Sequence, residues 1–200
     1  MADYRGIETV SEALMHLLRA TYDPADFDGN ALQFAVYVAD DFRQPMATGV
    51  SLFLYRVVPN GSHRTPRGRL DDRGLRLQPA LPLDLHYLMT LWARDASLQH
   101  RVAAWLMRVL EDTPILPHGL LDSVAPGVFH PDETVEVLPG ETSTEDLLHL
   151  WEALIEDGYQ LSIPYVVRNV YIESRRPLDE GAPVHERVLQ LRDADARPTL

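Results

Sequence analysis

The chain has 200 residues, 46% of them hydrophobic, and no cysteine. It is long enough for one domain with a buried core, and disulfides and thiolate metal sites are excluded. The formal net charge of −12 disfavours a general nucleic-acid binder, which needs a positive surface.

All 18 basic residues are arginine. Coding bias in a GC-rich genome explains this most simply, although arginine also pairs with carboxylates better than lysine does and so suits protein–protein contacts. The first residues, MADYRGIETV, lack the basic and apolar regions of a secretory signal. No apolar run approaches the roughly 18–20 residues that cross a bilayer. We therefore expect a cytoplasmic protein without a membrane partner.

The first half of the chain predicts a helix, two strands and a long loop. The helix spans residues 6–21 and ends before Asp23-Pro24. Residues 33–39 and 49–58 are predicted strands, and the second is apolar on both faces, as in a covered central strand. Residues 59–82 form a long polar loop, of a kind that is usually functional or mobile. The apolar positions of the helix are Ile7, Val10, Leu14, Leu17 and Leu18.

A third strand is predicted over residues 81–93, followed by a helix over residues 98–111 that Ser97 caps. On the strand, one face carries Leu83, Leu85, Tyr87, Met89 and Leu91. On the helix, the inward positions are Leu98, Val102, Trp105, Leu106 and Val109.

A proline-punctuated stretch, residues 113–131, leads to a short predicted strand over residues 134–138. Ser143 and Asp146 form a capping box for a helix that continues to about residue 156. Its expected buried residues are Leu147, Leu150, Trp151 and Leu154. The last long strand spans residues 160–174. Pro164 cannot donate to a ladder and therefore marks an edge, a bulge or the beginning of that strand.

Residues 175–200 are proline- and charge-rich and too polar to bury a core of their own, so they are predicted to be a tail. The fold class is then α/β (α+β): a single domain over residues 1–174. We expect a mixed or antiparallel sheet of four or five strands with two or three packed helices.

No pattern of catalytic residues stands out. Neither the dinucleotide-binding glycine motif nor a Walker loop occurs. Ser51 lies in Gly-Val-Ser-Leu-Phe, which departs from the hydrolase motif G-x-S-x-G, and is interpreted as a strand residue. His86, within an apolar strand, is interpreted as a structural histidine. We expect no catalytic residue and no cofactor.

Two histidine–aspartate pairs were considered as metal ligands, His118 with Asp122 and His130 with Asp132. They lie among proline and glycine rather than at i, i+4 on one helix, so no metal site is expected. The carboxylates Glu145, Asp146, Glu152, Glu156 and Asp157 are interpreted as favouring the N-terminus of their helix or as lying on its solvated face.

Five segments in succession resemble the tail-terminator, or tube-cap, family of phage-tail-like contractile injection systems. They are SLFLYRVVPN, LPLDLHYLMTLWA, LEDTPIL, EDLLHLWEAL and YQLSIPYVVRNVYIES. The resemblance covers about residues 6–174, and its most specific pieces are residues 83–88 and 161–165.

The resemblance implies a structural role. Members form a six-fold ring that ends the inner tube and contacts the last ring of the sheath, without a catalytic group. The expected partners are other copies of the chain in a homohexamer, the inner tube protein and the sheath protein. One alternative is a connector or completion subunit of a phage or prophage tail. Another is a small-molecule enzyme with no recognisable motif.

Two segments outside the resemblance are predicted to make contacts. The loop arginines are Arg64, Arg67, Arg69, Arg73 and Arg76, and we expect them to pair with carboxylates of a neighbouring copy or of the tube. The alternative is a solvated loop. In the tail, an unevenly alternating segment contains Val184, Val188, Leu189 and Leu191. It could add a strand to an open sheath edge, or remain disordered or pack on its own domain.

Overall fold

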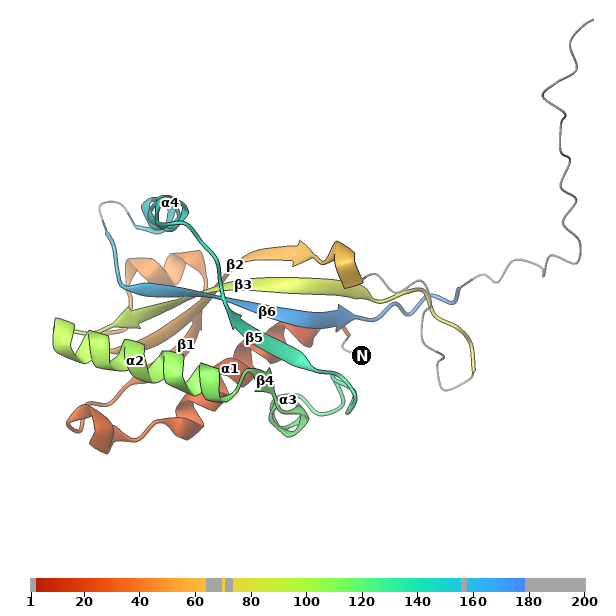
Figure 1. The fold of residues 1–200 in the computed structure, drawn as a ribbon, viewed down its shortest axis with the longest axis horizontal. Helices are drawn as coiled ribbons and strands as arrows, with labels where there is room; N and C mark the ends of the chain where they lie inside the picture. The colour runs from red at the N-terminus through yellow and green to blue at the C-terminus, as the bar shows by residue number, and fades with distance from the viewer. Residues whose placement is uncertain (1–2, 64–69, 71–73, 156–157, 179–200) are drawn as a thin grey trace, which may run out of the picture.

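The computed structural model describes residues 3–63, 70, 74–155 and 158–178. Among these residues, six strands form one mixed sheet in the order β1-β2-β3-β6-β5-β4, with helices on both faces (Figure 1). The strands are β1 (Gln33–Tyr37), β2 (Gly49–Pro59), β3 (Leu81–Trp92), β4 (Ile115–Leu116), β5 (Val135–Pro139) and β6 (Ser162–Ile172). The α-helices are α1 (Gly6–Thr21), α2 (Ala96–Asp112), α3 (His118–Val124) and α4 (Thr144–Leu154). Short 3-10 helices are η1 (Pro24–Phe27), η2 (Ala39–Arg43) and η3 (Gly61–His63).

The predicted α+β class is confirmed, and so is the long first helix. The sheet has one more strand, and the fold one more helix, than the upper counts predicted. Both additions, β4 and α3, lie in the proline-punctuated stretch. The strand has only two residues and the helix only seven, so neither is long enough to show hydrophobic periodicity.

Strands β1 and β2 are parallel, whereas the other neighbours in the sheet are antiparallel. The parallel pair requires a crossover connection. Residues 38–48, which include η2, provide it. At the start of β2, Gly49 pairs with Gln33 at φ +149°, and an added Cβ would lie 2.0 Å from the Gln33 carbonyl oxygen. Only glycine permits this close approach of the two backbones.

Helices α1, α2 and α3 pack on one face of the sheet and bury the larger core. The five β3 residues predicted to share a face, Leu83, Leu85, Tyr87, Met89 and Leu91, all lie in this core, so that prediction is confirmed. In α2 the fully buried residues are Leu98, Val102, Leu106 and Leu110, and the predicted Trp105 and Val109 are half-buried.

Helix α4 and η2 cover part of the opposite face. Their smaller core is aromatic and contains Tyr37, Phe42, Leu88, Trp92 and Trp151. The Trp92 indole N–H donates to the buried Ser51 hydroxyl at 2.8 Å, which confirms Ser51 as a structural strand residue. On α4, Trp151 is the fully buried residue, and the predicted Leu147, Leu150 and Leu154 pack around it half-buried.

Two helix starts test the predicted caps. At α4 the Ser143 hydroxyl accepts from the Asp146 backbone N–H at 3.0 Å, as predicted. At α2 the prediction was wrong. The helix begins at Ala96, and the cap is Asp95, whose carboxylate accepts from the Leu98 N–H at 2.9 Å. Ser97 therefore lies inside the first turn.

Pro164 is the third residue of β6 and precedes the stretch, residues 165–168, that pairs with β5. It therefore lies near the beginning of the strand, one of the three predicted positions. Its carbonyl accepts from the Gly140 N–H at 2.9 Å. Within the described ranges, no helix combines the length and hydropathy needed to cross a membrane.

Candidate assembly surfaces

An extension of the sheet, which we call the arm, consists of residues 70, 74–78 and 175–178. The Gln78 N–H donates to the Arg176 carbonyl at 2.8 Å, and the Leu178 N–H donates to the Arg76 carbonyl at 2.7 Å. Because β3 and β6 are antiparallel neighbours, these bonds continue their pairing beyond the sheet. Figure 1 shows the arm on the right, running out past the ends of β3 and β6.

The arm exposes apolar side chains. Leu70 is 62% exposed and Leu75 is 51% exposed. A hollow of about 240 Å³ is lined by Leu70, Gly74, Leu75, Arg76, Pro177 and Leu178. At the base of the arm, the Arg175 guanidinium lies 5.2 Å from the centre of the Tyr4 ring and 3.8 Å from the Asp3 carboxylate. These contacts tie the N-terminal residues to the arm, on which Leu70 and Leu75 stay at the surface.

The structure places one predicted interface residue, Arg76, on the arm. The other loop arginines, Arg64, Arg67, Arg69 and Arg73, lie outside the described residues, as do Val184, Val188, Leu189 and Leu191 of the tail. Their contacts therefore stay predictions. The pairing of residues 76–78 with the segment after β6 was not predicted, because the two segments are about a hundred residues apart in the sequence.

A second apolar surface lies on α4. A hollow of about 250 Å³, which we call the α4 hollow, is lined by Leu148, Trp151, Glu152, Ile155, Gly158 and Tyr159. Leu148 is 44% exposed and Tyr159 is 51% exposed. Trp151 is buried, and its indole N–H has no hydrogen-bond partner among the residues that the structure describes. An unpaired buried donor costs about 1–3 kcal/mol.

The sequence around the α4 hollow is acidic. Residues 141–157 contain six carboxylates and no arginine. The Asp146 carboxylate accepts from the Ser143 hydroxyl at 2.7 Å rather than from the Ser143 backbone N–H that a full capping box would use, and Glu145 and Glu152 are exposed. Sequence reasoning interpreted these residues only as helix-terminal or solvated. The sequence-based interpretation did not recognise that an acidic segment together with Leu148 and Tyr159 could form a contact surface.

The part of the sheet face that α4 leaves open carries polar residues. On β3, Asp84 and His86 alternate with the buried leucines. Asp84 accepts from the Asn60 side chain at 3.1 Å and lies 4.0 Å from the Arg168 guanidinium. Burial, followed by the charges of Arg56 and Arg168, lowers the pKa of His86. His86 is thus a partly buried structural histidine of this face.

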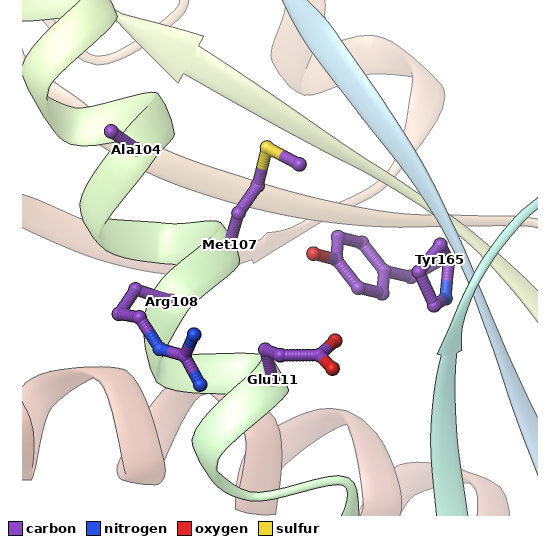
Figure 2. A pocket seen from close by; sticks show the side chains of 6 residues that line it. Ala104, Met107, Arg108, Glu111 and Tyr165 are labelled. Carbon is purple, nitrogen blue, oxygen red and sulfur yellow. The ribbon is translucent and has the colours of Figure 1, made fainter.

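A groove of about 390 Å³ separates α2 from the start of β6 (Figure 2). Met107, 49% exposed, and Glu111 reach into it from α2, and Tyr165 faces them from the sheet. Burial and the Glu111 charge raise the pKa of Tyr165. The phenol therefore keeps its proton near neutral pH and offers a hydrogen-bond donor rather than a nucleophile.

One of the two histidine–aspartate pairs, His118 with Asp122, lies in a helix and not in the irregular segment that was predicted. His118 and Asp122 lie at i, i+4 on α3, so the interpretation of their segment as irregular was wrong; the helix begins directly after Pro117. Asp122 accepts from the Gly127 N–H at 2.9 Å, which stabilises the turn after α3. Within the described part of the chain, no three His, Asp or Glu side chains are grouped as metal ligands.

Solved structures with this fold include a tube terminator and a tube-terminating cap. One is the sheath/tube terminator of an extracellular contractile injection system, PVC, in the extended state: TM-score 0.61, 20% identity, covering 96% of this chain and 65% of that one. The other is the anti-feeding prophage cap, a tube-terminating cap: TM-score 0.59, 20% identity, covering 91% of this chain and 60% of that one. The chain therefore spans less than two thirds of the length of either relative. No curated protein matches the sequence.

The family model that matches describes the Pvc16 N-terminal domain and covers residues 9–186. That range contains the whole sheet and nearly all of the four α-helices. The resemblance to tail terminators predicted from the five sequence segments is confirmed. The chain belongs to the family of Pvc16 N-terminal domains.

Proposed function

We propose that this chain is the terminator, or cap, of a contractile phage-tail-like injection system. It ends the inner tube and ties the tube to the last ring of sheath. The observation that carries the proposal is the match to a sheath/tube terminator over 96% of the chain. Family membership over residues 9–186 supports it independently.

We further propose that the cap is a ring of six copies, assembled in the cytoplasm, that works without catalysis or a cofactor. Ending a polymer requires only surfaces that bind the last subunits, and both relatives carry the name of a terminator or a cap. A cyclic ring is built from one contact repeated between neighbours. The arm and the α4 hollow supply exposed apolar surface for such contacts.

The capping activity can be measured on tube length. Tube protein polymerised alone should give long tubes of variable length, whereas addition of the chain should shorten them and place it at one end. Electron microscopy of both samples measures the length distribution and the decoration of the ends. If the tubes keep the same length distribution and carry no added protein at their ends, the proposal is wrong.

The loop arginines extend this proposal to particular residues. Replacing Arg67, Arg69 and Arg73 with alanine should weaken capping while leaving the monomer folded, because these side chains are proposed to pair with carboxylates of a neighbour or of the tube. Circular dichroism checks the fold, and the tube-length assay checks capping. If the triple variant gives the same tube lengths as the wild type, the loop arginines have no role in capping.

The tail has a separate proposed role as the connector to the sheath. Since Arg176 and Leu178 belong to the arm and pair with its residues 76–78, the informative truncation removes only residues 179–200. The truncated chain should still bind tube but release sheath, most visibly after contraction. Retention of both by the truncated chain would show that the connector lies elsewhere.

A further inference from the structure

We propose that the arm of one copy seats in the α4 hollow of the next copy, so that this contact repeats around the ring. The inference rests on the proposed function, which requires a ring. A ring closes through a head-to-tail interface, in which two different patches of the same chain meet. In Figure 1 the arm lies at the right and α4 toward the left of the long axis, so the two patches are well separated on the molecule.

The two surfaces match in their apolar side chains. The arm presents Leu70 and Leu75, 62% and 51% exposed, beyond the body of the sheet. The α4 hollow is concave and flanked by Leu148 and Tyr159, 44% and 51% exposed. Exposed apolar groups of this size mark contact sites when they cluster. Joining arm and hollow would cover all four side chains in one step.

The two surfaces are also opposite in charge. The arm carries Arg76, Arg175 and Arg176 and no carboxylate, and Arg176 is exposed. Residues 141–155 carry four carboxylates and no arginine. Contact between two arms, or between two α4 hollows, would place like charges together. Charge complementarity therefore favours arm-to-hollow contact over contact between two arms or between two hollows.

An unsatisfied donor gives an independent reason for a partner at the hollow. Trp151 lines it, is 1% exposed, and has an indole N–H without a hydrogen-bond partner in the described residues. Buried donors are nearly always paired in native proteins. Because this nitrogen is covered in the isolated chain, a shift of the Trp151 ring must accompany docking before a backbone carbonyl of the incoming arm, the acceptor that we assign, can pair with it.

Two variants of the 200-residue chain test the contact. Leu75→Asp places a charge on the apolar surface of the arm, and Leu148→Asp places one at the edge of the α4 hollow. Both leucines are exposed enough for the monomer to stay folded. Each variant alone should be monomeric by analytical ultracentrifugation. An equimolar mixture has one intact arm and one intact hollow for each pair, so it should form a 1:1 dimer and nothing larger. Met107→Asp, at 49% exposure on the α2 groove, is the matched control and should assemble like the wild type.

The outcomes separate this contact from the cap function. If both aspartate variants assemble like the wild type, or if their mixture stays monomeric, the contact is wrong, and tube-length control still tests the cap on its own. Because the chain has no cysteine, Leu75→Cys with Leu148→Cys also offers a clean cross-link between copies. Oxidation should give intermolecular ladders. A wild-type chain that remains monomeric up to its solubility limit, with no ladder from the cysteine variant, would overturn the proposal.

Discussion

The hydroxyl groups of Ser11 on α1 and Tyr87 on β3 lie 2.8 Å apart inside the larger core. Ser11 also donates to the Ile7 carbonyl at 3.1 Å, whereas the Tyr87 phenol is fully buried. Burial raises the pKa of Tyr87 far above its ordinary value, so this phenol stays protonated. The pair fixes α1 against the centre of the sheet.

The two partners should differ in their cost of removal. Tyr87→Phe should lower the free energy of unfolding by about 1 kcal/mol, since Ser11 keeps its bond to Ile7. Ser11→Ala should cost more, up to about 3 kcal/mol, because it leaves the buried phenol unpaired. Urea unfolding of both variants and of the double variant measures the difference. A larger cost for Tyr87→Phe would contradict this assignment.

The crossover between β1 and β2 depends on one glycine. Gly49→Ala places a Cβ 2.0 Å from the Gln33 carbonyl oxygen, so the two strands must separate. We expect a loss of about 1–3 kcal/mol, the range of an overpacked core position. Gly119→Ala on α3 is the control, because nothing lies within 4 Å of its added Cβ. In a helix that change should be neutral or stabilising by up to about 1 kcal/mol. Equal thermal midpoints for the two variants would refute the close approach.

The cap of α2 provides a matched pair of substitutions. Asp95→Ala should cost about 0.5–2 kcal/mol, because it removes the acceptor for the Leu98 N–H. Ser97→Ala should be nearly neutral, since Ser97 lies within the helix. The denaturant midpoints of the two variants decide which residue caps the helix. A larger fall of the midpoint for Ser97→Ala than for Asp95→Ala would show that Ser97 is the cap.

His86 should make the fold sensitive to acid. Its pKa is lowered in the folded protein, first by burial and then by Arg56 and Arg168. The unfolded chain therefore takes up a proton more readily, and stability falls as the pH drops below about 6.5. His86→Gln should show a smaller loss of the urea midpoint than the wild type between about pH 7.5 and pH 5.5. An identical loss in both proteins would assign the acid sensitivity to other groups.

The sequence predicted most of the fold because the long elements carry strong periodic patterns. The run Leu-Asp-Leu-His-Tyr-Leu over residues 83–88 alternates between the larger core and the opposite face, as its register in β3 requires. The cap of α2 was harder to predict because Asp95 and Ser97 are both residue types that favour caps and lie two positions apart, and the structure uses Asp95. The assembly surfaces were harder to predict. The arm depends on pairing between distant segments, and the α4 hollow depends on which side of α4 meets the sheet.

The central claim is that this chain forms the ring that caps the inner tube. Electron microscopy of the chain bound to the inner tube of its own particle tests it most directly. The account predicts one closed ring of six copies at a single end of each tube, with the arm of each copy on α4 of its neighbour. Bare tube ends, or a bound monomer, dimer or ring of another symmetry, would contradict it.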